Sequence, residues 1–292
     1  MKIAFIGIGN MGAPMSANLA AAGHQVLGYD IADRSAAGVT MVGSYAEAVA
    51  GAEIVITMLP DAPDVTQVYQ DTLPHARKGT LFIEGSTIDV ATAREVAQQA
   101  ASAGMSALDA PVSGGVMGAE AASLTIMVGG AKPDSDRAKP IFDLMGKRVI
   151  HCGDNGAGQA TKVCNNMLAG INMAATCEAI ALADKLGLDP QKLFEVVSTS
   201  SGFNWAMNVY CPIPGVGPDS PSDHGYEPGF SSDLMLKDLR LSQSAADMVA
   251  AETPMGARAE EIFAHFVEDE GQGSADFSAL YPRYSSNWPK KS

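Results

Sequence analysis

The feature that most constrains the fold is a glycine-rich turn near the start of the chain. Residues 2–7 (KIAFIG) form a short apolar run, which is typical of a strand buried on both faces of a parallel sheet. The motif GIGNMG (7–12) and a helix-favouring stretch (13–22) follow it. Such a G-x-G-x-x-G turn lets a pyrophosphate approach the backbone at a helix N-terminus. The sequence therefore predicts a dinucleotide site that includes Gly7, Gly9, Asn10, Met11 and Gly12.

A carboxylate follows the next strand. Residues 25–29 predict that strand, and Asp30 comes directly after it. At about this distance from the glycines, a carboxylate accepts hydrogen bonds from the adenine-side ribose and repels a 2′-phosphate. We therefore assign Asp30 to the ribose and favour NAD over NADP, although the nearby Arg34 could accommodate a phosphate. The alternative is that Asp30 is a turn residue.

Strand and helix signals keep alternating through the first half of the chain. Further strands are predicted at 53–59, 80–84, 106–108, 124–128 and 148–152, with helices at 89–103 and 133–145. This alternation predicts an α/β Rossmann domain over residues 1–161, with a doubly wound parallel sheet. Ligands of such sheets bind beyond the carboxyl ends of the strands, which here carry Leu59-Pro60, Ser86-Thr87 and Ser113-Gly114-Gly115.

The second half is helical in pattern. Residues 158–186 contain no proline and would form one helix, roughly 43 Å long. Its nearly all-round apolar character predicts burial, with a second subunit as one cover. Further helices are predicted from Pro190, over 231–251 and from Pro254, so residues 162–292 form an all-α domain. A loop dense in Pro and Gly spans 210–229, and the tail from Tyr281 is expected to be extended.

The long helix carries the main catalytic candidate. Gly158, Lys162 and Asn166 are four residues apart, so they fall on one helix face within about 80°. A lysine and an amide on one face could act on a single small ligand. We predict that this helix opens the second domain and carries both side chains into the cleft between the domains. The alternative is a solvated lysine.

Composition excludes several classes of function. The net charge of −14 and pI near 4.6 argue against nucleic acid and anionic membranes. The 4 cysteines and 5 histidines show no metal-ligand spacing, so we expect no metal site and reduced thiols in a cytoplasmic protein. We expect no membrane-spanning run, and a strand that starts at residue 2 leaves no room for a signal peptide.

Six motifs together resemble the β-hydroxyacid dehydrogenase family over essentially the whole chain. They are FIGIGNMGAPM, TMLP, GSTID, DAPVSGG, GAGQATKVCNN and DLMLKDLRLSQ. The insert that begins PIPGV and the ending DFSALY are similar to the 3-hydroxyisobutyrate branch. One departure is Glu84-Gly85, where the family has Asp-Ser, and we expect little consequence from it.

The resemblance implies roles for individual residues. Lys162 matches the catalytic lysine, Asn166 orients the substrate, and Ser113, Gly114 and Gly115 hold its carboxylate. Cofactor contacts are implied for Leu59, Pro60, Asp64, Thr87 and Lys237. Trp205 and Phe230 are either apolar walls for the substrate or ordinary core residues. The family joins a Rossmann domain through a long helix to a helical domain that forms dimers or tetramers.

The implied activity is NAD-dependent oxidation of 3-hydroxyisobutyrate to methylmalonate semialdehyde in valine breakdown. In that reaction Lys162 exchanges the hydroxyl proton as general acid and base, which requires a pKa lowered by burial or positive charge. Tartronate semialdehyde reductase or a related short-chain enzyme is the nearest alternative. A phosphogluconate dehydrogenase is disfavoured because the second half lacks a Lys/Arg cluster for a phosphate. The most distant alternative is a non-catalytic dinucleotide-binding protein.

Overall fold

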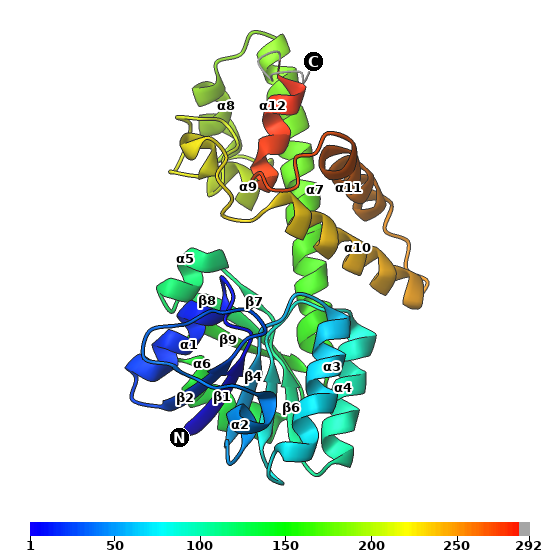
Figure 1. Ribbon diagram of the computed structural model, residues 1–292. Helices are drawn as coiled ribbons and strands as arrows, with labels where there is room; N and C mark the ends of the chain where they lie inside the picture. Colours follow the sequence, from blue (N-terminus) through cyan, green and yellow to red (C-terminus); the bar gives the residue numbers. More distant parts are fainter. Residues whose placement is uncertain (286–292) are drawn as a thin grey trace. The chain divides into compact units, whose positions relative to one another are not determined.

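The computed structural model describes residues 1–285 and divides the chain into two compact units (Figure 1). Unit 1 comprises Met1–Lys162, and unit 2 begins at Val163. Unit 1 contains the whole sheet, whereas the described part of unit 2 consists of helices and the loops between them, with one isolated bridge between Ser231 and Asp276.

Six parallel strands form the main part of the sheet in unit 1. They are β1 (Lys2–Ile6), β2 (Gln25–Tyr29), β3 (Thr40–Met41), β4 (Ile54–Thr57), β5 (Leu81–Glu84) and β6 (Ser106–Asp109). Their spatial order is β3-β2-β1-β4-β5-β6, the order of a Rossmann sheet. This order brings the carboxyl ends of β1, β4, β5 and β6 to one edge, as predicted.

Two of the last three strands depart from the predicted parallel arrangement. Strand β8 (Leu124–Gly129) pairs antiparallel with β6 and with β7 (Val112–Ser113), while β9 (Gly146–Gly153) runs parallel to β8. The prediction of an all-parallel sheet is therefore wrong here. Only α5 (Gly115–Glu120) and short turns connect β7 to β8, and a parallel crossover needs a longer connection of a dozen or more residues.

Helices cover both faces of the sheet (Figure 1). On β1, Ile3 and Phe5 pack into a core with α1 (Gly12–Ala21), α5 and α6 (Lys132–Phe142). The alternating residues Ala4 and Ile6 pack on the other side with α2 (Tyr45–Val49), α3 (Ala62–Thr72) and α4 (Val90–Ser102). This period-two alternation between two apolar layers is what buries the strands on both faces.

Helix α7 (Ala157–Lys185) begins in unit 1 and continues into unit 2. By length and composition alone it is long and apolar enough to cross a membrane, so the prediction that no run reaches this length is wrong. The core helix of a globular protein meets the same criteria, and half of the most apolar stretch of α7 is buried. Leu168 and Leu182 are 57% and 60% exposed, so the predicted all-round burial is wrong within this chain. Met173 and Cys177 are fully buried in the core of unit 2.

Unit 2 packs short helices around the rest of α7. They are α8 (Pro190–Val197), α9 (Trp205–Asn208), α10 (Ser232–Met248), α11 (Pro254–Ala264) and α12 (Leu280–Tyr284), with π-helix His265–Asp269 and 3-10 turns Pro221–His224 and Phe277–Ala279. The extended tail predicted from Tyr281 is wrong as far as Tyr284, because Tyr281 and Tyr284 pack against the apolar core that contains Phe277 and Leu280. The remainder of that prediction, 286–292, lies outside the described residues.

Candidate active site

The glycine-rich turn has the geometry that a phosphate-binding turn requires. Gly7 has φ +92°, and a Cβ atom there would lie 2.1 Å from the carbonyl oxygen of Met58 at the end of β4. A Cβ on Gly12 would lie 1.8 Å from the carbonyl oxygen of Gly7, so α1 packs directly on the turn. These two positions therefore accept only glycine, for reasons internal to the protein.

Gly9 differs from these two glycines. Among residues 1–285, the only heavy atom within 4 Å of a Cβ added to Gly9, apart from its chain neighbours, is Nη1 of Arg34, at 3.0 Å, the far end of a flexible side chain. Within the described residues, no side chain caps the start of α1, which begins at Gly12. An open backbone surface beside a helix start fits the approach of a pyrophosphate, so the turn fits the cofactor that the motif predicts.

Asp30 is held in place by the backbone. Its side chain is 8% exposed, and its two oxygens accept the N–H groups of Ile8 (2.7 Å) and Ala32 (2.8 Å). Nη1 of Arg34 lies 3.7 Å from the carboxylate. The carboxylate is thus fixed beside the glycine-rich turn, with its remaining lone pairs available to ribose hydroxyls.

The loops after β4 and β5 are joined through Ser86. Its hydroxyl accepts the N–H of Leu59 (2.7 Å), and its own N–H donates to the carboxyl of Glu84 (2.6 Å). Glu84 is 1% exposed and also accepts the hydroxyl of Thr57. Burial raises the pKa of Glu84 to about 7, although these hydrogen bonds oppose the rise. Glu84, where the chain departs from the family pattern, is therefore a buried, titratable group at the end of β5, directly before the loop that carries Thr87.

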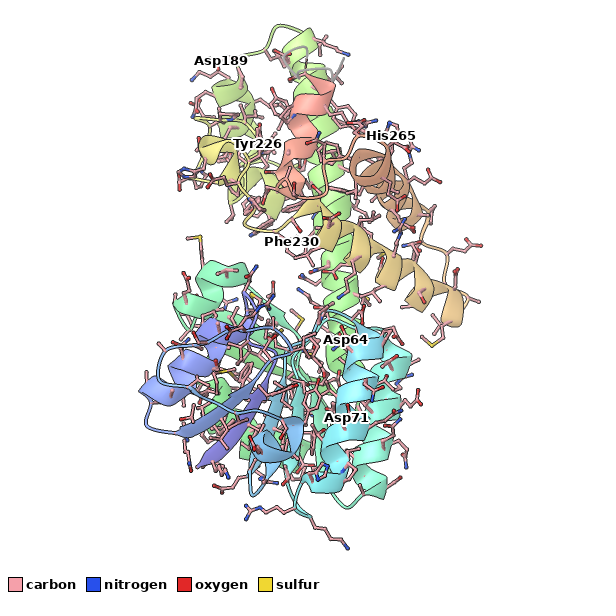
Figure 2. The ribbon with its side chains drawn as sticks, viewed as in Figure 1. Asp64, Asp71, Asp189, Tyr226, Phe230 and His265 are labelled. Carbon is pink, nitrogen blue, oxygen red and sulfur yellow. The ribbon has the colours of Figure 1, made fainter. Side chains whose placement is uncertain are left out.

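Asp64 stands apart from these loops. It is exposed in the first turn of α3, and Figure 2 labels it at this end of the helix, with Asp71 toward the other end. Its N–H donates to the side chain of Asp61, the N-cap of α3. Partial desolvation, followed by the charge of Asp61, raises the pKa of Asp64. These contacts describe a helix start, so the cofactor role of Asp64 rests on the family resemblance alone.

Lys162 lies near the start of α7 and is 6% exposed, which excludes the alternative of a solvated lysine. The carboxylate of Asp109, at the end of β6, accepts the N–H groups of Gly156 (2.7 Å) and Gln159 (2.9 Å) and so fixes this helix start. A Cβ on Gly158 would lie 2.4 Å from the carbonyl oxygen of Met127, so α7 lies directly on the strands. The helix turn before Lys162 is therefore held rigidly in unit 1.

The Ser113-Gly114-Gly115 segment turns from β7 into α5. Gly114 and Gly115 have φ values of +135° and +63°, which suit glycine. Ser113 is half-buried and Gly114 is exposed. Backbone N–H groups and one hydroxyl thus stand close together in the chain at this turn, a donor set that suits a carboxylate.

In unit 2, Asn166 joins α7 to α10. Its amide donates to the carboxylate of Asp238, which is 3% exposed, and accepts from the amide of Asn165 (2.9 Å). Lys237 is half-buried on α10 beside Asp238. The DLMLKDL motif therefore contributes Asp238, a partner of Asn166 that the sequence alone did not identify.

An aromatic cluster holds Trp205 and Phe230. Trp205 stacks on Tyr210 with ring centroids 4.8 Å apart, and Phe277 packs against Trp205, Tyr210 and Phe230. Trp205 is 46% exposed, whereas Phe230, labelled in Figure 2, is half-buried. Both side chains pack on the core residue Phe277, but neither is fully buried. The interpretation of Trp205 and Phe230 as ordinary core residues is therefore only partly correct.

Asp276 anchors this cluster. It is 0% exposed and accepts the hydroxyl of Tyr210 (2.8 Å) and the N–H groups of Gly229 (3.0 Å) and Phe230 (3.0 Å). Burial and the nearby carboxylate of Asp276 raise the pKa of Tyr210, so its hydroxyl stays a donor. Sequence reasoning missed both residues, although DFSALY, the motif of Asp276, and the loop that starts at Tyr210 were both noted.

Among the described residues, no group of three or more His, Cys, Asp or Glu side chains could hold a metal ion. Unit 1 combines the Rossmann strand order with a fitting glycine-rich turn and a carboxylate after β2. These features define a dinucleotide-binding protein of the Rossmann class.

Comparisons with known proteins narrow the class. Residues 2–153 match the family described as the NAD binding domain of 6-phosphogluconate dehydrogenase. Residues 156–284 match the NAD-binding family of NADP-dependent 3-hydroxyisobutyrate dehydrogenase. A probable 3-hydroxyisobutyrate dehydrogenase of Mycobacterium tuberculosis is 50% identical over 283 residues, with 95% of this chain and 96% of that protein covered.

One further relative and one solved structure cover the chain almost completely. The 3-hydroxyisobutyrate dehydrogenase of Pseudomonas aeruginosa is 46% identical, over 97% of this chain and 98% of that protein. A structure of the M. tuberculosis enzyme with L-serine matches with a TM-score of 0.92 and 50% identity, covering 96% of this chain and 97% of that one. The chain therefore belongs to the 3-hydroxyisobutyrate dehydrogenase family, as the resemblance predicted, and is an NAD(P)-dependent oxidoreductase.

Proposed function

We propose that this protein oxidises 3-hydroxyisobutyrate to methylmalonate semialdehyde with NAD⁺, a step of valine catabolism in the cytoplasm. The observation that carries the proposal is the burial of Lys162 at the rigid start of α7. The relatives of this chain are named 3-hydroxyisobutyrate dehydrogenase or probable 3-hydroxyisobutyrate dehydrogenase. A buried amine on a fixed helix turn suits proton transfer, because its position is set before the substrate binds.

Lys162 is the proposed general base. Its amine accepts the proton of the substrate hydroxyl while the carbon that carries this hydroxyl loses one hydrogen as a hydride, so the alcohol becomes an aldehyde. In the reverse direction its ammonium group returns the proton to the oxygen. The bound nicotinamide supplies the hydride acceptor, and the chain supplies orientation and the proton path.

The proposed carboxylate site is the turn of Ser113, Gly114 and Gly115. Its support is the donor set of two glycine N–H groups and one hydroxyl at a backbone bend. Three donors pair both oxygens of a carboxylate without a full positive charge. Short hydroxy acids would thereby be held at one end.

From unit 2 we propose three contributions. Asn166 orients the substrate, which is supported by the fixing of its amide by Asp238. Trp205 and Phe230 provide apolar walls for the methyl group, supported by their incomplete burial and their packing on Phe277. Lys237 is proposed to contact the cofactor, on the family pattern alone.

We propose NAD rather than NADP as the cofactor. The support is the carboxylate of Asp30, which the N–H groups of Ile8 and Ala32 fix beside the glycine-rich turn. A fixed carboxylate accepts ribose hydroxyls and repels a 2′-phosphate. Leu59, Pro60 and Thr87 are the proposed nicotinamide-side contacts, and Asp64 is retained only on the family pattern.

L-Serine is the second candidate substrate, because it is also a 3-hydroxy acid. An NAD-dependent L-serine dehydrogenase of P. aeruginosa is 43% identical over 96% of this chain, and the matching M. tuberculosis structure contains L-serine. Reduction of tartronate semialdehyde is a further alternative of the same chemistry.

We also propose a homodimer or homotetramer through the helical unit, supported by the exposed Leu168 and Leu182 of α7.

A substrate panel tests this proposal. NADH formation is followed by absorbance with (S)-3-hydroxyisobutyrate, L-serine and D-glycerate, each with NAD⁺ and NADP⁺. We expect kcat/KM for 3-hydroxyisobutyrate with NAD⁺ to be about tenfold or more above the others, the range that one altered side group gives in an apolar pocket. Preference for serine or glycerate would move the enzyme to that activity, and no reduction with any pair would contradict the proposal.

A further inference from the structure

The side chain of Gln159 is a buried amide that bridges two elements of unit 1. It is 0% exposed, and its Nε2 donates to the carbonyl oxygen of Ser86 (2.7 Å). Its Oε1 accepts the N–H of Ile88 (3.2 Å). The two bonded backbone groups flank Thr87, so the amide fixes the peptide groups on either side of that residue.

The main chain of Gln159 is fixed as well. Its N–H donates to Asp109 at the end of β6, while its side chain reaches the loop after β5. Lys162 follows three residues later on the same helix, which places it one turn away and on the neighbouring face. One residue therefore ties the helix turn before Lys162 to two strand ends.

Ser86 extends this connection to a third strand end. Its hydroxyl accepts the N–H of Leu59, which follows β4, and its N–H donates to Glu84. The peptide groups around Thr87 and the start of the Leu59-Pro60 loop are thus linked to Gln159 by hydrogen bonds among buried and partly buried groups. Such bonds are short in range but rigid when every partner is satisfied.

We propose that Gln159 is a positioning residue, which holds the Ser86–Ile88 backbone at a fixed distance from the helix turn that carries Lys162. The proposal deepens the function proposed above and rests on the catalytic role given to Lys162. Mere space filling is the competing explanation. It predicts that an apolar side chain of similar size would serve equally well.

Two substitutions separate these explanations. Gln159→Met keeps the length but removes both hydrogen bonds. Gln159→Glu keeps both only while the new carboxyl is protonated, because only the acid form can donate to the carbonyl of Ser86. The charged groups around this turn are Asp109 of β6, Glu84 of β5, Arg94 of α4, whose Nε would lie 2.8 Å from a Cβ on Gly156, and Lys162 itself.

The pH profile of Gln159→Glu is therefore diagnostic. As pH rises, the new carboxyl loses the proton that it donates to Ser86, so activity should fall relative to wild type through its apparent pKa. At low pH the variant should recover toward wild type, whereas Gln159→Met should show no such recovery. Gln98→Met on α4, where the residue is exposed, is the matched control.

The closing experiment combines kinetics with two measurements that need no turnover. For Gln159→Met we expect kcat to fall about 100-fold with little change in the KM for NAD⁺, the usual cost of displacing a reacting group by about 1 Å. We also expect faster hydrogen exchange at the amide of Ile88, followed by mass spectrometry. The rate at which an amine-acylating reagent labels Lys162 should also differ between Gln159→Met and the wild type.

The outcomes are distinct. Wild-type kcat in Gln159→Met, or an unchanged pH profile in Gln159→Glu, would overturn the positioning role. Failure of the wild type with every substrate would instead reject the proposed function. Exchange at Ile88 and labelling of Lys162 would then still decide the inference, since unchanged values in Gln159→Met would overturn it and changed values would support it.

Discussion

The two units hold their site residues by different means. In unit 1 the glycine-rich turn, Asp30 and Ser86 are fixed through backbone groups, such as the N–H of Ile8 on Asp30 and the N–H of Leu59 on Ser86. In unit 2 the site residues are fixed by side chains distant in the sequence, such as Tyr210 on Asp276. The comparison teaches that unit 1 holds its site through hydrogen bonds between the loops that follow neighbouring strands, whereas unit 2 depends on buried side chains such as Asp276.

The largest effect should come from removing the proposed base. Lys162→Ala should lower kcat by about 10³-fold or more, the upper range for a lost general base. The affinity for NAD⁺, measured by calorimetry, should change little, because the glycine-rich turn is independent of this side chain. Lys185→Ala, at the exposed end of α7, is the control. Full turnover of Lys162→Ala would remove the lysine from the mechanism.

The largest effect on stability should come from Asp276→Ala, which is expected to destabilise unit 2. It removes a fully buried acceptor of the Tyr210 hydroxyl and of the N–H groups of Gly229 and Phe230. It also removes the acceptor of the N–H and hydroxyl of Ser278, which are buried donors. We expect the free energy of unfolding to fall by about 4 kcal/mol, since each buried donor left without an acceptor costs 1–3 kcal/mol. Urea unfolding followed by tryptophan fluorescence measures this. A fall of less than about 1 kcal/mol in the free energy of unfolding would contradict the claim that buried side chains such as Asp276 hold unit 2 together.

Glu84 gives unit 1 a pH-dependent stability. Its pKa is about 7 in the folded chain against an ordinary 4.5, so the folded state holds the proton more tightly. The free energy of unfolding should therefore fall as pH rises from about 4.5 to about 7, by about 3 kcal/mol in total. Glu84→Gln should remove this part of the slope, whereas the exposed Glu95→Gln should keep it. Equal slopes in wild type and Glu84→Gln, from unfolding curves at several pH values, would disprove the assignment.

The smallest effect concerns cofactor choice. Asp30→Asn removes the charge beside the glycine-rich turn but keeps an oxygen for the N–H of Ile8. We expect the ratio of kcat/KM for NAD⁺ over NADP⁺ to fall about tenfold, or 1.4 kcal/mol. Asp33→Asn, an exposed neighbour, should leave the ratio unchanged. A wild-type ratio in Asp30→Asn would assign the discrimination to other groups, with Arg34 first among them.

The backbone-based part of the fold could be predicted from the sequence because its signals are local. The run before Gly7, the glycines and the strand before Asp30 predicted the Rossmann domain, and the proline-free stretch predicted α7. The antiparallel β8 could not be predicted, because pairing direction depends on connection length and on which edge remains open.

The site was predictable to a similar extent. The place of Lys162 on the long helix was predicted, but the amide of Gln159 and the carboxyl of Glu84 acquire their roles only where three strand ends meet. Asp276 and Tyr210 are separated by the whole of α10 and α11, so no local pattern links them. Residues whose partners are distant in the sequence are therefore those that sequence reasoning missed.

The most direct test of the central claim is the transfer of deuterium from the substrate. 3-Hydroxyisobutyrate with deuterium on the carbinol carbon is incubated with the enzyme and NAD⁺, and the reduced cofactor is analysed by mass spectrometry. The account predicts that the reduced cofactor carries deuterium, and that the initial rate is lower than with the unlabelled substrate if hydride transfer limits turnover. Reduced cofactor without deuterium, or none at all, would contradict the assignment of this chain as a 3-hydroxyisobutyrate dehydrogenase.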